Sequence, residues 1–303
     1  MIKSYTITTD RGDSIKLEMT RPEKSGFIIS EVEGLGPVKS TFNTTKTAAQ
    51  HGTKYNSSSL DQRNIVMHFI FCETKTESIE DIRHKSYKYF PVDNKIEMIV
   101  ETDKRVVKIE GYVESNEPNI YSNQEGCVVS ILCPDPFFYS MHTVKTTFSG
   151  YEPVFEFPFE NDSIDEPMLI MSVMNNKTVE KIMYDGDFST SIEITIHATG
   201  QASNISIYNV DTHEQMHINT DKIIAKTGNS IIAGDTIVIN TAQGNKSVTL
   251  IRDGAAIDIF NCINRDADWF MLSKGLNVFA YKADVGERSL QFYIENKIVY
   301  TGV

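Results

Sequence analysis

The chain of 303 residues lacks the long apolar segments of a membrane protein and the closely spaced cysteine pairs of many secreted ones. No apolar run approaches the roughly 20 residues that a membrane-spanning helix needs. The N-terminal MIKSYTITTDRGD alternates polar and apolar residues, whereas a signal peptide would carry an apolar block. We therefore expect no membrane insertion, and folding in the cytoplasm in which the chain is made.

Cysteine is scarce, and no C-x-x-C spacing occurs among Cys72, Cys127, Cys133 and Cys262. Cys127 and Cys133 flank VVSIL, which reads as a strand and would separate their Cα atoms by about 20 Å. Disulfide-bonded Cα atoms lie within about 7 Å of each other, so these two cysteines cannot pair. Buried free thiols are the expected state.

Positive charge is deficient, above all in the second half. Residues 151–303 carry 11 lysine and arginine against 21 aspartate and glutamate, a net charge of −10, whereas residues 1–150 carry 18 against 20, a net charge of −2. Nucleic-acid-binding domains present the opposite pattern, a dense basic surface that neutralises phosphate. Nucleic-acid binding is therefore not expected. With 40% hydrophobic and 23% charged residues, the composition is that of a folded globular protein.

What the chain does contain is alternation with period two, the pattern of half-buried strands. It runs through YTITTD, SIKLEM, GFIISEV and NIVMHFIF. Residues 34–62 interrupt it with GLGPVKSTFNTTKTAAQHGTKYNSSSLDQ, which is polar, small and aperiodic. A loop of this length in a compact domain is usually functional or disordered. We expect a loop that becomes ordered against a partner; an idle surface loop is the alternative.

One helix is predicted in the first half, over TESIEDIRHKSYKYF. Its apolar residues, Ile79, Ile82, Tyr87 and Phe90, recur on one helical face. A Thr-x-Ser start precedes glutamate in the first turn, and Pro91 provides the stop.

The two halves predict two domains and a mainly β fold class. Strands with one helix fill residues 1–148, an α+β arrangement, and the composition turns acidic around FSGYEP. Residues 149–303 are almost purely short strands separated by Gly, Asn or Asp turns, the pattern of a β-sandwich.

The second half contains one motif associated with catalysis, HEQMH, from His213 to His217. In a helix, H-E-x-x-H spacing lets two histidines bind zinc while the glutamate, here Glu214, acts as the base. The flanking NISIYNV and INTDKIIAK are extended in type, which predicts a hairpin with Asp211 to Gln215 near its bend. On a strand the two histidines would lie about 13 Å apart, too far for one ion with Zn–N bonds of about 2 Å. We expect no metal, no cofactor and no catalytic site.

The single tryptophan, Trp269, lies in DADWFMLSKGLNVFAY. It could stack on a sugar, as aromatic side chains do in lectin-like sandwiches, but a lone tryptophan on a strand more often belongs to the core. A long polar loop, a β architecture and no catalytic constellation together indicate a structural or assembly protein.

The order of these parts resembles that of the siphophage distal tail proteins, the family at the junction of tail tube and baseplate. In the first half the resemblance rests on EGLGPVKS, HGTKYNSSSLDQRNIVMHFIF, SIEDIRHKSYKYF, RVVKIEGYVES and CPDPFFYS, in that order. In the second half it rests on AGDTIVINTAQGNKSVTL and DADWFMLSKGLNVFAY. It covers nearly the whole chain.

The resemblance implies a hexameric ring in the tail tip or baseplate of a phage or a bacteriocin-like particle, assembled in the bacterial cytoplasm. Residues 1–148 would form an α+β split-barrel or sandwich belt around a channel, and residues 149–303 a galectin-like, jelly-roll sandwich projecting outward. Partners would be the tail tube protein, a tail-tip or hub protein and a receptor-binding protein. DNA would pass through the channel without binding.

The resemblance also implies that the long loop packs against a neighbouring subunit or the tube, and Phe42, His51 and Tyr55 are the candidate interface residues within it. Two other functions stay open. One is a tail-associated zinc metallopeptidase using HEQMH, and the other is a glycan-binding module in residues 149–303.

Overall fold

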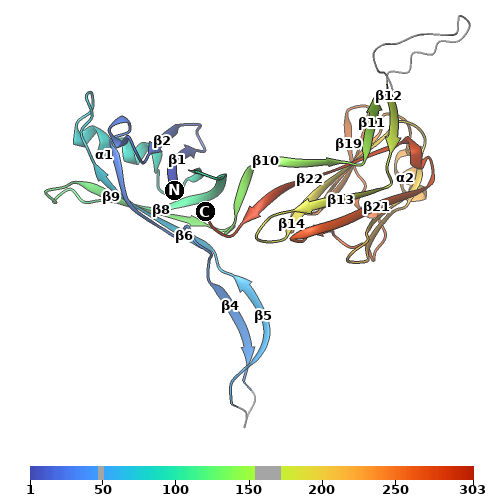
Figure 1. The fold of residues 1–303 in the computed structure, drawn as a ribbon, viewed down its shortest axis with the longest axis horizontal. Helices are drawn as coiled ribbons and strands as arrows, with labels where there is room; N and C mark the ends of the chain where they lie inside the picture. Colours follow the sequence, from blue (N-terminus) through green and yellow to red (C-terminus); the bar gives the residue numbers. More distant parts are fainter. Residues whose placement is uncertain (47–50, 154–171) are drawn as a thin grey trace, which may run out of the picture. The chain divides into compact units, whose positions relative to one another are not determined.

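The structure, a computed structural model, describes residues 1–46, 51–153 and 172–303. The chain forms two compact units: unit 1 comprises Met1–Met141 with Val299–Val303, and unit 2 comprises His142–Ile298. Strands predominate in both (Figure 1). The mainly β fold class is therefore confirmed.

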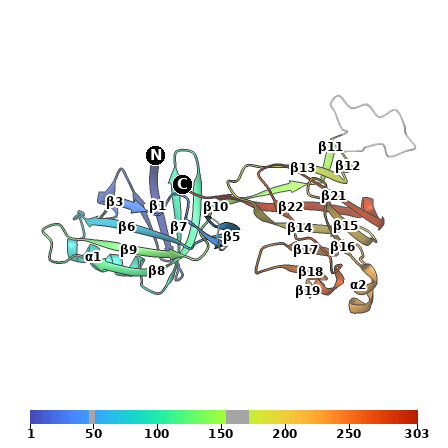
Figure 2. The ribbon, with the colours of Figure 1, turned by 90° about the horizontal axis from the view of Figure 1, so that it is seen from below.

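Unit 1 is built on one antiparallel sheet in the order β3-β6-β9-β8-β7-β1-β2, with β10 pairing β8 at Tyr139 and Ser140. Figure 2 shows its strands from β3 and β6 through β9 and β8 to β7 and β1. Its elements are β1 (Ile2–Thr9), β2 (Ser14–Glu18), the 3-10 turn η1 (Pro22–Lys24), β3 (Phe27–Glu33), β4 (Ser40–Thr45), β5 (Lys54–Leu60), β6 (Arg63–Phe71), α1 (Ile79–Tyr89), β7 (Lys95–Thr102), β8 (Val106–Pro118), β9 (Gly126–Cys133) and the start of β10 (Phe138–Thr147), which continues into unit 2.

The alternation in the sequence becomes one-sided burial in these strands. In β6 every second side chain is buried, from Ile65 through Met67 and Phe69 to Phe71. Because successive side chains of a strand point to opposite faces, this set forms one wall of the core of unit 1. The strands predicted from YTITTD, SIKLEM, GFIISEV and NIVMHFIF are all confirmed.

The long strand β8 pairs with β7 through its first half and with β9 through its second half. Gly111 lies where the two pairings meet. A Cβ atom at this position would lie 2.7 Å from the Cys133 Sγ and 2.8 Å from the Ile131 Cγ2. Only glycine therefore allows β8 to approach β9 this closely.

Helix α1 begins where the sequence predicts, because its N-cap is satisfied from both sides. The Ser78 hydroxyl accepts a hydrogen bond from the Asp81 N–H, and the Asp81 carboxylate accepts one from the Ser78 N–H. This reciprocal pair is a capping box. The predicted apolar face is partly wrong: Ile82 and Phe90 are buried, but Tyr87 is 42% exposed and Ser86 takes the buried position.

The segment 34–62 was predicted to be a loop, and this prediction is wrong. Strands β4 and β5 pair from Ser40 opposite Leu60 to Thr45 opposite Lys54 and form a two-stranded hairpin. The hairpin projects away from the sheet of unit 1 (Figure 1). Both of its faces are open to solvent, so its side chains need no apolar alternation, and the period that marks half-buried strands is absent from its sequence.

A buried cation, Arg63, organises the base of this hairpin. Its side chain is almost fully buried and donates hydrogen bonds to the carbonyl groups of Gly34, Gly36, Pro136 and Thr301. These four acceptors come from three separate stretches of unit 1. The sequence reading did not identify this residue.

The ring of Phe138 completes the environment of Arg63. It lies 4.5 Å, centroid to Cζ, from the guanidinium, the geometry of a cation–π contact. Burial lowers the pKa of Arg63 below its ordinary value, but an arginine remains protonated in proteins.

The last five residues of the chain return to unit 1. The Thr301 carbonyl accepts from Arg63, and the Val303 N–H donates to the Leu35 carbonyl. Two chain connections therefore run between the units, one after Met141 and one before Val299.

Unit 2 contains two sheets, ordered β13-β21-β15-β16 and β19-β18-β17-β14-β22. Its elements are β11 (Ser149–Pro153), β12 (Ser172–Asn176), β13 (Val179–Tyr184), β14 (Thr190–Ala198), β15 (Ser203–Asn209), β16 (Glu214–Ile218), α2 (Thr220–Thr227), β17 (Thr236–Asn240), β18 (Ser247–Arg252), β19 (Ala255–Asp258), the 3-10 turn η2 (Phe260–Cys262), β20 (Met271–Leu272), β21 (Gly275–Val285), the 3-10 turn η3 (Glu287–Ser289) and β22 (Leu290–Tyr300).

The two sheets of unit 2 enclose one core. Tyr281 from β21 and Phe292 from β22 stack with their ring centroids 3.8 Å apart, and Ile194 from β14 and Ile207 from β15 are buried in the same cluster. Because each sheet contributes its alternate residues to this interior, the arrangement is a sandwich, as predicted.

Helix α2 contradicts the extended reading of INTDKIIAK. The Asn219 side chain caps the helix by accepting from the Lys222 N–H, and Gly228 ends it in the left-handed conformation at φ 80°. Both residues are typical of these positions. The helix has only eight residues, too few to be stable alone in water, so contacts with the rest of unit 2 decide its conformation.

An ion pair fixes the end of α2. The Arg252 guanidinium donates to the Asp235 carboxylate at 2.6 Å and 2.8 Å, to the Thr227 hydroxyl and to the Ser230 carbonyl. Asp235 is fully buried. Hydrogen bonding to this carboxylate raises the pKa of Arg252 above its ordinary value.

All four cysteines are free, and Cys127, Cys133 and Cys262 are buried while Cys72 is half-buried. Burial raises the pKa of Cys127 and that of Cys133 to about 12, so both are protonated at neutral pH. The expected state of buried free thiols is confirmed for these three residues.

Among the described residues, no helix is both long and apolar enough to cross a membrane.

The Arg63 site makes a stability prediction. We expect Arg63→Met to lower the free energy of unfolding by roughly 2–4 kcal/mol, because it leaves buried carbonyl groups without a donor. Urea denaturation followed by circular dichroism measures this. Arg105→Met is the matched control, since Arg105 also lies over an aromatic ring, that of Tyr300, but is exposed. It should cost less than about 1 kcal/mol, and equal losses in the two variants would contradict the role of Arg63.

Candidate functional site

The β4–β5 hairpin carries two exposed aromatic side chains, Phe42 and Tyr55, which we call the aromatic pair. Phe42 is 63% exposed and Tyr55 is 59% exposed. Their ring centroids lie 6.3 Å apart in an edge-to-face arrangement. The structure thus brings together two of the three candidate interface residues named from the sequence, and it leaves both open to solvent.

Polar side chains join the two strands of the hairpin around the aromatic pair. The Asn43 amide donates to the Ser57 hydroxyl at 3.1 Å, and the Asn56 amide donates to the Thr45 hydroxyl at 2.6 Å. Such cross-strand pairs each stabilise a sheet by less than about 1 kcal/mol. They hold the register of the hairpin without supplying a hydrophobic core.

Both outer edges of the hairpin are open, because β4 and β5 pair only with each other within the described residues. A strand edge presents unpaired N–H and C=O groups that can accept another strand. A two-stranded hairpin is also marginally stable by itself in water. The hairpin therefore has two strand edges at which a further strand could pair.

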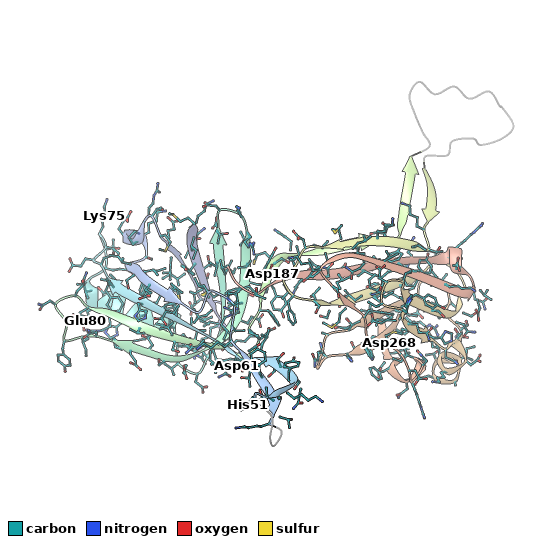
Figure 3. All side chains as sticks on the ribbon, turned by 60° about the horizontal axis from the view of Figure 1, so that its bottom comes forward. His51, Asp61, Lys75, Glu80, Asp187 and Asp268 are labelled. Atoms are coloured by element: carbon teal, nitrogen blue, oxygen red, sulfur yellow. The ribbon has the colours of Figure 1, made fainter. Side chains whose placement is uncertain are left out.

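His51 lies apart from the aromatic pair. It follows residues 47–50, which are outside the described residues, at the far end of the hairpin, while Asp61 lies near its base (Figure 3). The Asp61 carboxylate accepts from the Thr41 hydroxyl at 2.7 Å. Within the described part of the chain, His51 makes no hydrogen bond, ion pair or ring contact, so the structure gives it no role in positioning the aromatic pair.

The HEQMH motif lies in a hairpin, as predicted. Strands β15 and β16 pair with Ser206 opposite His217 and Asn209 opposite Glu214, and His213 occupies the turn at φ 59°. The His217 Nδ1 is hydrogen-bonded to the Ser206 hydroxyl at 2.9 Å. Because the stretch from Glu214 is extended, the two histidines are not on one helical face.

The glutamate of the motif has a structural partner instead. The Thr212 hydroxyl donates to the Glu214 carboxylate at 2.8 Å. The adjacent Gln215 N–H donates to the Asp268 carboxylate at 3.0 Å. The motif residues thus tie the β15–β16 turn to the chain before β20.

In the described residues, one group of potential metal ligands converges elsewhere, in unit 1. The ligand atoms of Glu31, Glu33 and His68 lie within 4.8 Å of one another on β3 and β6. The i, i+2 spacing of the two glutamates was the signal available in the sequence, since it places both on one face of a strand. All three side chains are solvent-accessible, and exposed acidic groups gather commonly without an ion.

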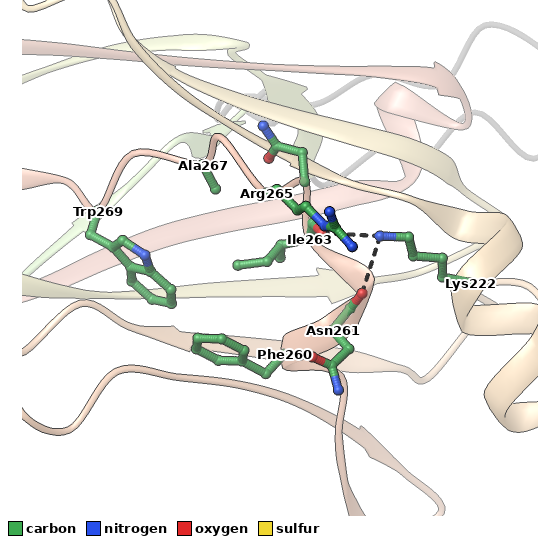
Figure 4. A pocket seen from close by; sticks show the side chains of 8 residues that line it. Lys222, Phe260, Asn261, Ile263, Arg265, Ala267 and Trp269 are labelled. Atoms are coloured by element: carbon green, nitrogen blue, oxygen red, sulfur yellow. Dashed lines mark hydrogen bonds between the residues drawn. The ribbon is translucent and has the colours of Figure 1, made fainter.

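Trp269 is neither a core residue nor a freely exposed one. Its indole stacks on the ring of Phe260 with centroids 5.5 Å apart, and it packs against the edge of the core of unit 2. Together with Lys222 and Arg265 it lines a cavity of about 430 Å³ (Figure 4). The expectation that the lone tryptophan belongs to the core is therefore only partly met.

Comparison with protein families assigns both halves of the chain to phage tails. The family described as "Phage tail protein RIFT-related domain" matches residues 15–133. The family described as "Siphovirus-type tail component, C-terminal domain" matches residues 185–293. No curated protein sequence matches the chain.

The fold along nearly the whole chain is shared with a solved structure. The crystal structure of the SPP1 Dit (gp 19.1) protein, described as a paradigm of the hub adsorption apparatus in Gram-positive infecting phages, matches with a TM-score of 0.65 and 13% identity over 98% of this chain and 99% of that chain. A chain of the phage P2 baseplate in its activated conformation with calcium matches with a TM-score of 0.44 and 12% identity over 97% and 98%.

The family matches and the SPP1 Dit fold agree with the order of parts in the sequence. The first match spans most of the sheet and the helix of unit 1, and the second spans most of the sandwich of unit 2. The chain, a structural component of a phage tail, belongs to the siphophage distal tail protein family.

Proposed function

We propose that six copies of this chain form a ring at the junction of the tail tube and the tail tip or baseplate, and that the ring connects the tube to the receptor-binding apparatus. Unit 1 forms the belt around the channel and unit 2 forms the periphery. The observation that carries this proposal is the β4–β5 hairpin, which forms two paired strands although its side chains are exposed to solvent.

The neighbouring copy of unit 1 is the partner that the hairpin fits best. Aromatic residues are enriched at the centres of protein interfaces, where they bury a large area with few rotatable bonds. The exposed aromatic pair, Phe42 and Tyr55, supplies such an anchor. In a closed ring every copy donates its hairpin to the next one, so no unpartnered hairpin remains.

A covering partner would also satisfy the open strand edges. The hairpin has few apolar side chains with which to stabilise itself, and its strands are STFNTT and KYNSSSL. Backbone pairing with a neighbour adds hydrogen bonds that do not depend on side-chain type. This explains how a polar, aperiodic segment can serve as an assembly element.

The charge distribution fits a channel through which DNA slides. Residues 1–150, which supply most of unit 1, carry a net charge of −2, and residues 151–303 carry −10. A basic channel would retain DNA by releasing counterions from its phosphates. A near-neutral belt avoids this, and an acidic periphery limits association between particles.

The function is structural and not enzymatic. The competing zinc peptidase requires His213 and His217 on one helical face with Glu214 free to act as a base. The hairpin of β15 and β16 and the bond from the Thr212 hydroxyl to Glu214 oppose both requirements.

The ring makes a prediction about the aromatic pair. The purified protein should have six times the monomer mass of 34.2 kDa in light scattering. The double variant Phe42→Ser, Tyr55→Ser should dissociate at a concentration about tenfold higher or more, because it removes the anchor of each interface. Tyr121→Ser is the control, since Tyr121 is 97% exposed in the same unit but lies outside the hairpin. A double variant that assembles like the parent protein would contradict the proposed interface.

A second prediction concerns DNA. The assembled ring should not bind a fluorescent DNA duplex at about 150 mM salt, since unit 1 lacks a net positive charge to exchange for counterions. Fluorescence anisotropy measures this, and repeating it at low salt tests whether any binding is purely electrostatic. A micromolar dissociation constant at the higher salt concentration would refute the proposed passive channel.

A third prediction concerns metal. Elemental analysis of the purified protein should find no stoichiometric zinc, because the two histidines of HEQMH cannot reach one ion from a turn and a strand. His213→Ala should therefore leave the metal content unchanged. One zinc per chain that disappears in this variant would establish the peptidase-type site and overturn the structural reading of the motif.

A further inference from the structure

Unit 2 contains a cavity that neither the ring nor the sandwich core requires. It lies between the start of α2, the turn η2 and the chain leading to β20, and its volume is about 430 Å³ (Figure 4). Pockets for small molecules commonly measure about 300–1,000 Å³. The lining residues are Lys222, Phe260, Asn261, Ile263, Asn264, Arg265, Ala267 and Trp269.

One part of the cavity lining is aromatic. The rings of Phe260 and Trp269 stack at an interplanar angle of 20°, and the Lys246 ammonium lies 5.0 Å from the indole. Phe260 is 38% exposed, so part of this stacked pair is accessible to a ligand. An ordered and accessible aromatic surface offers an apolar, flat contact to a ligand at little entropic cost.

Some polar groups of the cavity lining already form hydrogen bonds within the protein. The Lys222 ammonium donates to the carbonyl groups of Asn261 and Ile263 at 3.2 Å and 3.3 Å, as Figure 4 shows. The Asn264 side-chain oxygen accepts from the His217 N–H at 2.9 Å. These contacts hold the backbone of the lining in place, and they leave the Asn264 amide NH₂ available to a ligand.

Two further groups are free. Within the described residues, the Arg265 guanidinium and the Asn261 side-chain amide make no hydrogen bond or ion pair, and both residues are exposed. A guanidinium presents five N–H donors in a plane and suits carboxylate and phosphate groups. A primary amide both donates and accepts, which suits hydroxyl groups.

The charge of the lining is opposite to that of its surroundings. Two of the eight lining residues are cationic and none is acidic, although residues 151–303 as a whole carry a net charge of −10. In such an acidic half, cations without a carboxylate among the lining residues favour an anionic ligand. An uncharged ligand would lack the charge-assisted hydrogen bonds to Arg265, which are the stronger kind.

We propose that this cavity binds an anionic saccharide, a sugar that carries a phosphate or carboxylate group. The sugar ring packs on the Phe260–Trp269 surface, the amides of Asn261 and Asn264 bind its hydroxyl groups, and the Arg265 guanidinium binds the anionic substituent. The aromatic surface accounts for the apolar face of the ring, which inorganic phosphate lacks, and the two amides account for the hydroxyl groups of the sugar. This activity is additional to ring formation.

The single tryptophan of the chain makes the test direct, because all tryptophan fluorescence comes from Trp269. The full-length protein is titrated separately with glucose 6-phosphate, glucuronic acid, glucose, inorganic phosphate and AMP. We expect a saturable fluorescence change with glucose 6-phosphate or glucuronic acid, and binding weaker by about tenfold or more with glucose, which lacks the charge-assisted hydrogen bonds.

Two variants assign the effect to the cavity. Arg265→Ala should weaken the binding of the anionic sugars by about tenfold and leave the binding of glucose unchanged, since only the charged contact is lost. Arg11→Ala is the matched control, because it removes an exposed arginine from unit 1, and it should change nothing. Since Arg265 is exposed and unpaired, its replacement should also leave the thermal unfolding temperature unchanged.

Three outcomes would overturn the proposal. No saturable change with either anionic sugar up to high millimolar concentrations would exclude the site. Inorganic phosphate binding as tightly as glucose 6-phosphate would show an anion site that does not recognise the sugar. AMP binding more tightly than both anionic sugars would assign the cavity to a nucleotide. None of these results bears on the hexameric ring, which is tested separately by its mass.

Discussion

One buried cation determines how unit 1 is put together. Arg63 donates to carbonyl groups at Gly34, Gly36, Pro136 and Thr301 without a carboxylate among these partners. Burying an unpaired charge is costly, and four carbonyl acceptors with an aromatic ring offset that cost. The acceptors lie where the hairpin begins, where the chain leaves unit 1 and where it returns. The same side chain therefore contacts the segment before the β4–β5 hairpin and the two segments of unit 1 that lead to and from unit 2.

In unit 2 a largely buried arginine is instead paired with a carboxylate. Arg252 is paired with the buried carboxylate of Asp235, which raises the pKa of the arginine, whereas burial lowers that of Arg63. The pair anchors the end of α2, and Lys222 near the start of α2 binds carbonyl groups of the cavity lining. The helix that borders the cavity is thus held at both ends. Lys222 lies in the helix and donates to carbonyl groups outside it, and Arg252 lies outside the helix and donates to the Thr227 hydroxyl at its end.

Some surfaces of the protein have their hydrogen-bonding groups and apolar side chains already paired within the chain, and others do not. The proposed functions lie on the unpaired surfaces. The inner strands of the unit 1 sheet and of the sandwich pair on both sides and bury their alternate side chains, so they offer little to a partner. The hairpin with Phe42 and Tyr55 is ordered but uncovered, and the cavity keeps the Arg265 guanidinium and the Asn261 amide free of partners within the described residues. These two places carry the proposals, assembly in unit 1 and ligand binding in unit 2, because a partner adds there what the fold leaves incomplete.

The sequence by itself determined the strands whose side chains alternate between core and solvent, such as β6, and the start of helix α1 at Ser78. It also predicted the hairpin at HEQMH that opposes a zinc site. One-sided burial imposes a period on the residues, and that period is legible without coordinates. Only the tertiary structure decided the β4–β5 hairpin, which buries nothing, and α2, which is too short to be stable alone. The same holds for Arg63 and the cavity around Trp269, because their partners are distant in the chain and contacts between distant residues leave no periodic trace in the sequence.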